Sequence, residues 1–416
     1  MDSISAVALG LKVGIVGGSI AGCAAAIELA RLGCDVTLFE RSGEELKDRG
    51  AGIGVPPSVI ETFRKRGLID PQIPVFEAGA FVRRWRTIAE PRHGYLAWRQ
   101  TTVMALLNWG ALYRSLRERV PAGVYHTEQR VVAITQHGER AVLSLANGSQ
   151  REFDLVVCAD GYASLGRQTL FPQVRLPYAG YVLWRGFLLE TKLSESGPLE
   201  NGIHAVGFPG GHGIFYFVPG LKGETEPGKR IVNWAVYTPV APAEITMFLT
   251  DNMGRAREGS LPPGAMPIAT EQALKAAARS RLPEYYAEIV DSSDQTSAYG
   301  IYDCEVPAYR QGRVCLVGDA AAFARPHSGA GAFKGMNDAA NLSDALSTNT
   351  SIETALSLWN TERTTAGNQI VRFGNQLGRA LVKEIPDWST MNAAKMESWF
   401  TSLVTEKTEM FGVKEK

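Results

Sequence analysis

A glycine-rich turn near the amino end constrains the fold more than any other feature of the sequence. Residues 17–22 read GGSIAG, and they stand between an apolar segment at 11–16 and a segment of small residues at 21–32. A second apolar segment follows at 35–39. This order predicts strand, helix and strand within about thirty residues. Glycines at such a turn let backbone N–H groups at the start of the helix approach a pyrophosphate, so Gly17 and Gly22 are predicted to bind a dinucleotide.

Glu40 ends the second predicted strand, where a carboxylate accepts hydrogen bonds from ribose hydroxyls. We count it and the adjacent Arg41 among the cofactor-binding residues. Ser19 departs from the usual pattern, because it stands where the middle glycine of GxGxxG is expected. Its side chain is small, so the backbone can still approach a phosphate closely, and Ser19 is included in the predicted site.

A second motif, ADGYASLGR, occupies residues 159–167 and follows a buried apolar segment at 155–158. Asp160 and Gly161 predict a turn at the end of a strand. Arg167 is suited to a phosphate or a carboxylate, because its guanidinium can donate two parallel hydrogen bonds.

The third motif is the most specific, and it begins with GRVCLVGDAA at residues 312–321. It predicts a buried strand, a turn at Gly318 and Asp319, and a loop through Pro326, Gly329 and Gly331 that leads into a helix. The helix carries NDA at 337–339. A helix N-terminus stabilises negative charge that develops on a bound group.

The three motifs together resemble those of the class A flavoprotein aromatic hydroxylases, whose fold is like that of para-hydroxybenzoate hydroxylase, and the resemblance covers nearly the whole chain. Within this family the chain is most similar to the 2,6-dihydroxypyridine 3-hydroxylase type. Four segments carry that similarity: GGS at 17–19, YAGYVLWRG at 178–186, GHG at 211–213 and RPH at 325–327. Many relatives have an FAD-binding arginine before the helix expected at 112–119. This chain has LNWG at 107–110, so that role is not transferred.

The resemblance implies an α/β fold in which a Rossmann-like FAD-binding domain is interrupted by a mainly antiparallel β-sheet substrate domain, with a helical C-terminal part. Aromatic segments between 178 and 238 are expected to form much of that sheet, and 261–282 and 283–291 to be helices. The expected domains are FAD-binding at 1–75, 100–175 and 298–350, substrate-binding at 76–99 and 176–297, and C-terminal helices at 351–416.

The resemblance also implies the chemistry. NAD(P)H reduces FAD, the reduced flavin takes up O₂, and a flavin C4a-hydroperoxide hydroxylates an electron-rich aromatic or N-heteroaromatic ring of the phenol or hydroxypyridine type. The Gly318–Asp319 turn is implied to bind the ribityl chain, and the loop from Pro326 is implied to run beside the flavin ring. Because the cofactor supplies the reactive chemistry, neither a metal nor a nucleophilic triad is expected.

Candidate residues for the reacting centre lie on the aromatic strands and among glycines. Loop histidines that titrate near neutrality are candidates for proton transfer. The predicted catalytic residues are His212, His327 and Tyr216, and the predicted substrate-binding residues are Tyr181, Trp184, Arg185 and Tyr237. Alternate side chains of a strand point to opposite faces, so about half of those on the strands are expected to face the flavin. GAGIG at 50–54 resembles the family loop on the flavin's other side.

Composition narrows the class of protein. The 416 residues include 43 Lys plus Arg and 43 Asp plus Glu, a balance that argues against nucleic acid or an anionic membrane as the main partner. The odd number of cysteines, 5, without a CxxC pair predicts buried free thiols in a reducing compartment, and hence a cytoplasmic protein. The expected partners are a small aromatic substrate and O₂. A homodimer is one option for the oligomeric state.

Several alternatives stay open at this stage. An N-hydroxylase, a quinone-ring hydroxylase or a non-oxygenating FAD-binding protein would have the same flavin motifs. A flavin halogenase is disfavoured because the WxWxIP run of that group is absent from the sequence. A plain Rossmann dehydrogenase would give the second and third motifs no role. The ring of the substrate, the choice between NADH and NADPH, and the group that deprotonates the substrate are not specified by the motifs.

Overall fold

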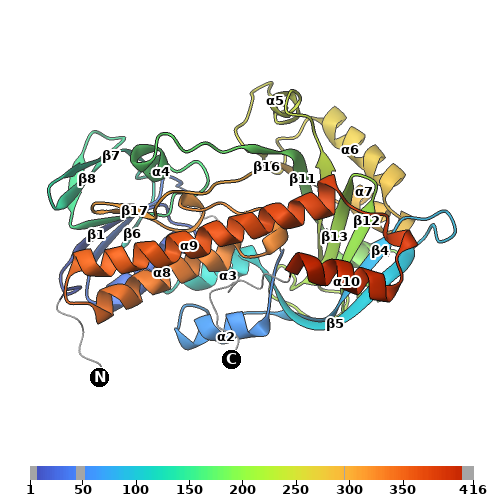
Figure 1. Cartoon of the computed structure of the whole chain (residues 1–416), viewed down its shortest axis with the longest axis horizontal. Helices are drawn as coiled ribbons and strands as arrows, with labels where there is room; N and C mark the ends of the chain where they lie inside the picture. Colours follow the sequence, from blue (N-terminus) through green and yellow to red (C-terminus); the bar gives the residue numbers. More distant parts are fainter. Residues whose placement is uncertain (1–6, 44–51, 295, 405–416) are drawn as a thin grey trace.

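The computed structural model describes residues 7–43, 52–294 and 296–404, and Figure 1 shows its two main sheets at opposite ends of the molecule. The six-stranded sheet has the order β17-β18-β10-β1-β2-β6 and the nine-stranded sheet β15-β16-β11-β14-β13-β12-β4-β5-β3, while β7, β8 and β9 form a small third sheet. The six-stranded sheet consists of β1 (Lys12–Val16), β2 (Asp35–Phe39), β6 (Tyr125–His126), β10 (Leu155–Cys158), β17 (Arg310–Gln311) and β18 (Val314–Leu316).

The six-stranded sheet is parallel at its centre, where β10, β1 and β2 lie side by side. Its central strands are mainly apolar, as expected for strands covered on both faces. Val13, Ile15 and Val157 are fully buried in the largest core. Helix α1 (Ile20–Arg31) packs against α8 beneath this sheet, and its alanines allow the close approach.

The nine-stranded sheet is mostly antiparallel and supplies the other half of the molecule. Its strands are β3 (Gly52–Val55), β4 (Phe76–Trp85), β5 (Tyr95–Asn108), β11 (Tyr178–Leu189), β12 (Ile203–Phe208), β13 (Gly211–Val218), β14 (Ile231–Pro239), β15 (Ser260–Leu261) and β16 (Ser297–Tyr302). The third sheet consists of β7 (Val131–His137), β8 (Arg140–Leu145) and β9 (Gln150–Phe153). One face of the large sheet is covered by α6 and α7, so the opposite face is the one turned toward the C-terminal helices (Figure 1).

Two long helices connect the two halves. In Figure 1, α8 and α9 run side by side, and α9 extends toward the large sheet, where α10 lies against β5. The helices after α1 are α2 (Pro57–Lys65), α3 (Trp109–Arg117), α4 (Leu165–Leu170), α5 (Ile245–Phe248), α6 (Ile268–Arg281), α7 (Glu284–Asp291), α8 (Gly331–Thr348), α9 (Ile352–Gly378) and α10 (Ala393–Val404). A π-helical turn, Arg379–Lys383, follows α9.

The predicted α/β fold class is confirmed, but two details differ. The expected helix at 261–282 begins only at Ile268, because Pro262, Pro263 and Pro267 interrupt the pattern and Ser260–Leu261 pairs as β15. The expected domain boundary near residue 100 falls inside β5, which stays in the large sheet as far as Asn108. The strand runs through this position without a glycine or a proline, so no turn signal marks a boundary.

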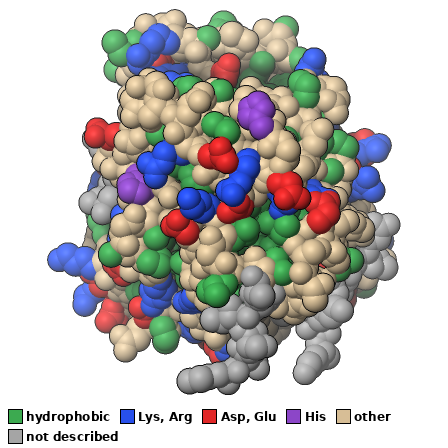
Figure 2. Space-filling model, turned by 90° about the vertical axis from the view of Figure 1, so that its left-hand side faces the viewer, with side chains coloured by type: hydrophobic (Ala, Val, Ile, Leu, Met, Phe, Trp, Pro, Cys, Tyr) green, Lys and Arg blue, Asp and Glu red, His purple; other side chains and the backbone are tan. Residues whose placement is uncertain are grey.

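The surface and the cysteines agree with the composition. Lys, Arg, Asp and Glu side chains intermix on the face in Figure 2 and do not gather by sign. All five cysteines are buried free thiols, as predicted. Within the described ranges, no helix has the length and apolar character needed to span a bilayer.

Candidate functional site

The three sequence motifs meet at one edge of the six-stranded sheet because their strands are parallel and in register. Val16 on β1 lies beside Cys158 on β10, and Cys158 lies beside Leu316 on β18. Each motif turns directly after its strand, so the three turns are neighbours in space. The carboxyl edge of a parallel sheet is where folds of this class bind dinucleotides.

The first turn has no room for side chains. A Cβ on Gly17 would lie 2.5 Å from the carbonyl oxygen of Ala159, and a Cβ on Gly22 would lie 1.9 Å from the carbonyl oxygen of Gly17. The side chain of Ser19 makes no capping hydrogen bond to α1. The first-turn N–H groups of α1 therefore remain directed at the edge of the sheet, where they can donate to a phosphate.

Glu40 lies at this edge and is buried. Its Oε2 accepts from the Gly18 N–H at 2.8 Å, and its Oε1 accepts from the Ser42 N–H at 2.8 Å. Each carboxylate oxygen has a further lone pair, so a ribose hydroxyl can still donate to it. Arg41 is next to it and exposed. Glu40 thus stabilises the glycine turn through hydrogen bonds, and its carboxylate oxygens can each accept a further hydrogen bond from a ligand.

Asp160 has one committed oxygen and one free one. Its Oδ2 accepts from the N–H groups of Leu165, at 2.7 Å, and Gly166, at 3.3 Å, at the start of α4. Its Oδ1 is buried and has no hydrogen-bond partner in the part of the chain that the structure describes. Burial raises the pKa of this carboxyl. A buried acceptor without a partner is costly, so this position fits a ligand hydroxyl or a bound water. Gly161 follows with a φ of 77°, which the turn requires.

Arg167 has a different environment from the one expected. Its guanidinium is buried and donates to the carbonyl oxygens of Asp319, at 3.1 Å, and Ala320, at 2.9 Å, and also to that of Tyr162. Backbone carbonyls thus hold the guanidinium, and direct phosphate binding by Arg167 stays a prediction. Arg167 connects the second motif to the third and holds the two turns together.

Hydrogen bonds from side chains of α8 hold the third turn in place. Lys334 is buried and donates to the Gly318 carbonyl at 2.8 Å and to Oδ2 of Asp338 at 2.9 Å, and this same oxygen accepts from the Gly318 N–H at 2.9 Å. Arg363 contacts the other oxygen of Asp338. Burial raises the pKa of Asp319 to about 6, although Lys334 and Arg167 act in the opposite direction. Sequence reasoning missed Lys334 and named Asp338 only as part of the third motif, without a role; their i, i+4 spacing was the available signal.

The loop after this turn reaches the large sheet. Pro326 begins a short 3₁₀ helix that ends at Gly329, whose φ is 66°. A Cβ on Gly329 would lie 3.3 Å from the carbonyl oxygen of Gly54 on β3. Gly331 then begins α8. The predicted loop at 50–54 is therefore close to this one, although its first two residues lie outside the described ranges.

Four rings from separate segments form a cluster at this junction. His327, in the loop, lies 3.0 Å from the Tyr181 hydroxyl through Nε2, and its ring centroid is 4.2 Å from that of Tyr237. His212 stacks on Tyr237 at 4.8 Å and 15°, and its Nδ1 lies 3.1 Å from the Leu381 carbonyl. The structure thus brings together four of the seven predicted catalytic and substrate-binding residues on the face of the sheet opposite α6.

Both histidines of this cluster are neutral. Burial lowers the pKa of His212 to about 3 and that of His327 well below its ordinary value. Burial also raises the pKa values of Tyr181 and Tyr237. The expectation that the histidines titrate near neutrality is therefore wrong, because both rings are enclosed. Neutral imidazoles beside protonated phenols can donate and accept hydrogen bonds without carrying charge.

An ion pair anchors the cluster. Arg325 donates to both carboxylate oxygens of Asp303, at 2.8 and 2.7 Å, and its third nitrogen lies 3.4 Å from the Tyr181 hydroxyl. Asp303 lies just after β16 and was not predicted, since no motif includes it. The pair fixes the start of the Pro326 loop against the sheet.

The Tyr216 side chain lies on the same face of the sheet, but its hydroxyl is hydrogen-bonded to the backbone. Its hydroxyl donates to the Gly52 carbonyl at 2.9 Å, while the Gly52 N–H donates to Asn233 at 2.8 Å. Burial raises the pKa of Tyr216 to about 12. Tyr216 therefore ties β3 to the sheet, a positioning task in place of the predicted catalytic one.

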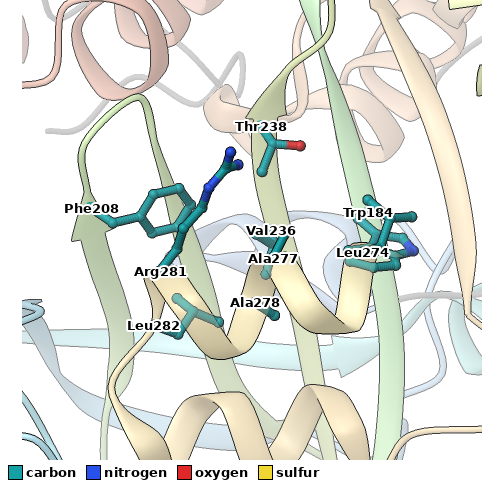
Figure 3. A pocket seen from close by; sticks show the side chains of 9 residues that line it. All are labelled: Trp184, Phe208, Val236, Thr238, Leu274, Ala277, Ala278, Arg281 and Leu282. Atoms are coloured by element: carbon teal, nitrogen blue, oxygen red, sulfur yellow. The ribbon is translucent and has the colours of Figure 1, made fainter. Parts of the chain in front are cut away.

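Trp184 points to the opposite face of the sheet. It is buried against Trp234 and lines a small apolar cavity beneath α6, together with Val236 and Leu282 (Figure 3). Its predicted role in substrate binding is corrected, because neighbours along a strand face opposite ways and Trp184 lies between Leu183 and Arg185. Arg185 faces the cluster side, with its guanidinium 5.8 Å from the ring centroid of Tyr299.

Comparisons with known proteins agree on the class. Family models match residues 178–303 (FAD binding domain-like), 12–68 (Pyridine nucleotide-disulphide oxidoreductase) and 78–179 (Flavin containing amine oxidoreductase). The chain is 28% identical to a 2,6-dihydroxypyridine 3-monooxygenase of Paenarthrobacter nicotinovorans, over 88% of this chain and 91% of the relative. It is 28% identical to a salicylate hydroxylase of Pseudomonas putida, over 80% and 76%. The solved structure of 2,6-dihydroxypyridine-3-hydroxylase from Arthrobacter nicotinovorans superposes with a TM-score of 0.82 at 25% identity, covering 90% of this chain and 93% of that one.

Proposed function

We infer that this chain, which belongs to the flavin-containing aromatic hydroxylases, is an FAD-dependent monooxygenase that hydroxylates an electron-rich aromatic or hydroxypyridine ring. The overall reaction consumes NAD(P)H, a proton and O₂, places one oxygen atom on the ring and releases the other as water. One observation carries the inference: three cofactor-type turns share one sheet edge, and the loop from the third turn carries His327 into a cluster of buried rings.

The residues at the sheet edge fit FAD. Gly17 and Gly22 leave a backbone surface for the pyrophosphate, Glu40 can accept from the ribose, and the partnerless Oδ1 of Asp160 calls for a donor. Asp319, at the third turn, is our candidate for the ribityl hydroxyls. When bound, FAD supplies the redox chemistry by which NAD(P)H electrons activate O₂.

The ring cluster is our candidate for the substrate side. The neutral imidazole of His327 can hold a ring hydroxyl of the substrate by a hydrogen bond and orient it, beside the Tyr181 hydroxyl 3.0 Å away. Loss of the hydroxyl proton would make the ring more nucleophilic. Tyr237 and His212 contribute flat apolar surface that excludes water and orients the substrate ring. Arg185 can stabilise the negative charge of the ionised ring.

Location, oligomeric state and domain division are further parts of the proposed function. Buried free thiols favour a reducing, cytoplasmic location. The homodimer stays a prediction, to be checked by sedimentation. We also keep the division into an FAD-binding part, a substrate-binding sheet and C-terminal helices, with the boundary between residues 99 and 100 moved to the end of β5 at Asn108.

The test is to purify the protein, record its visible spectrum and follow NADH and NADPH oxidation with a panel of phenols and hydroxypyridines. We expect flavin absorbance and oxidation that one class of ring compound stimulates. Flavin without stimulated turnover would favour another acceptor for the same fold. A protein that takes up no flavin, even with FAD added, would contradict the proposal.

A further inference from the structure

The Tyr181 hydroxyl lies between one group that can only donate a hydrogen bond and one that can either donate or accept. Nη1 of Arg325 is 3.4 Å from the hydroxyl oxygen, and Nε2 of His327 is 3.0 Å from it. A guanidinium has no acceptor, so Arg325 donates to the Tyr181 oxygen. The proton of Tyr181 therefore needs an acceptor elsewhere.

Asp303 fixes the direction in which Arg325 donates. The other two guanidinium nitrogens of Arg325 donate to the two carboxylate oxygens of Asp303, at 2.8 and 2.7 Å. Both side chains are buried. Two parallel hydrogen bonds fix the plane of the guanidinium, so its third nitrogen stays directed at Tyr181.

Nε2 of His327 is the acceptor that remains for the Tyr181 proton. The Tyr181 side chain is fully buried, and its hydroxyl has no other hydrogen-bond partner among the described residues. The backbone of Gly378 closes one side of the contact, because a Cβ there would lie 2.3 Å from the Tyr181 hydroxyl oxygen and 2.7 Å from Nη1 of Arg325. A buried hydroxyl proton without an acceptor is disfavoured about 10-fold or more, so Tyr181 donates to His327.

A neutral imidazole that accepts through Nε2 carries its proton on Nδ1. His327 is neutral, because burial lowers its pKa well below the ordinary value. The hydrogen bond made by one ring nitrogen of a histidine determines whether the other nitrogen is protonated. Within the described ranges Nδ1 of His327 makes no hydrogen bond, so its N–H stays available to a ligand.

We propose that Asp303 and Arg325 are positioning residues that fix, through Tyr181, the Nδ1–H tautomer of His327. The loop from Pro326 then presents a hydrogen-bond donor to the site. Under the proposed function, on which this last step rests, that N–H holds an oxygen of the bound ring. The tautomer itself depends only on contacts within the protein, so it can be measured without turnover.

The test is ¹⁵N NMR of the histidine-labelled protein with FAD added, because imidazole nitrogens with and without a proton differ widely in chemical shift. The His327→Gln variant identifies the His327 signals. We expect about 90% or more of the Nδ1–H tautomer at His327 in the native protein, from the about 10-fold preference. His212 is an internal reference with the same tautomer, since its Nδ1 faces the Leu381 carbonyl oxygen, which can only accept.

Tyr181→Phe should give a mixture of the two tautomers at His327 and leave the His212 signals unchanged. Tyr237→Phe is the matched control, because that ring also contacts His327, with centroids 4.2 Å apart, but makes no hydrogen bond to it. It should keep the native pattern. Arg325→Lys retains a donor and should keep the native pattern, whereas Arg325→Met should give the mixture.

A native His327 that is charged or protonated on Nε2 overturns the proposal. So does a native pattern that persists in Tyr181→Phe, and this variant retains the ion pair, so it serves even if Arg325→Met does not fold. A native pattern in a folded Arg325→Met protein removes the positioning role of the pair. Lack of ring-stimulated NAD(P)H oxidation would contradict the proposed function alone, because the spectra are recorded without substrate.

Discussion

The edge of the six-stranded sheet and the face of the nine-stranded sheet satisfy their polar groups in different ways. At the edge, several charged groups are hydrogen-bonded to the backbone: Glu40 to Gly18, Arg167 to Asp319 and Ala320, Lys334 to Gly318. On the face, ring side chains contact one another: the ring of His327 lies against that of Tyr237, which stacks on His212. The candidate cofactor site at the edge is therefore formed mainly by backbone groups. The candidate substrate site on the face is formed mainly by side chains that a substrate can contact.

The largest effect should come from adding one methyl group at the edge. Gly22→Ala places a Cβ 1.9 Å from the Gly17 carbonyl, and the backbone cannot yield without opening the turn. We expect the protein to lose FAD during purification, as measured by absorbance. Gly197→Ala is the control, because nothing lies within 4 Å of its Cβ. Normal flavin content in Gly22→Ala would show that the turn is not the cofactor site.

The next largest effect is expected at Lys334, which connects helix α8 to the Gly318 turn. Lys334→Met leaves the Gly318 carbonyl and part of Asp338 unpaired in the core, so we expect a loss of about 3 kcal/mol in the free energy of unfolding. Urea denaturation measures it. Lys65→Met, which breaks an exposed pair with Glu61, should cost less than about 0.5 kcal/mol. Similar losses in the free energy of unfolding of both variants would show that Lys334 stabilises the protein no more than an exposed lysine does.

A third substitution tests the ring cluster on the face of the nine-stranded sheet. His327→Gln removes the neutral imidazole beside Tyr181, and we expect kcat to fall about 100-fold with flavin content unchanged. The exposed His137→Gln serves as control. If kcat stays within a factor of two while FAD is lost, His327 belongs to the cofactor site and not to the substrate side.

The smallest effect is a pH dependence of the flavin-free protein. The pKa of Asp319 rises from 3.8 to about 6 on folding, so the folded state holds the proton more tightly than the unfolded state. Its stability contribution is therefore present below pH 4 and is lost as the pH rises to 6. Relative to the native chain, Asp319→Asn should gain about 1–2 kcal/mol between pH 4 and 7 by thermal unfolding. Parallel pH profiles of the two proteins would contradict this assignment.

The contrast between the backbone turns and the side-chain cluster also explains which features the sequence could predict. The turns at Gly17, Asp160 and Gly318 were predictable because tight backbone geometry admits few residue types, and the family resemblance that they indicated is confirmed. The strand sequence around Tyr181 predicted a sheet but not which residues face the cluster. Trp184 was assigned to the wrong face, since aromatic residues on both faces hide the alternation.

Other features depended on contacts distant in the chain. Arg167 was expected to bind phosphate, and only the fold shows that its Nη1 also donates to the carbonyls of residues 319 and 320. The neutrality of His212 and His327 follows from enclosure by three separate segments.

The most direct test of the central claim is the origin of the oxygen atom in the product. The FAD-loaded enzyme would be supplied with NAD(P)H, a stimulating ring compound and ¹⁸O₂, and the product analysed by mass spectrometry. The account predicts one ¹⁸O atom on the ring for each product molecule formed. NAD(P)H oxidation that yields only hydrogen peroxide and an unlabelled ring, with every ring compound of the panel, would contradict it.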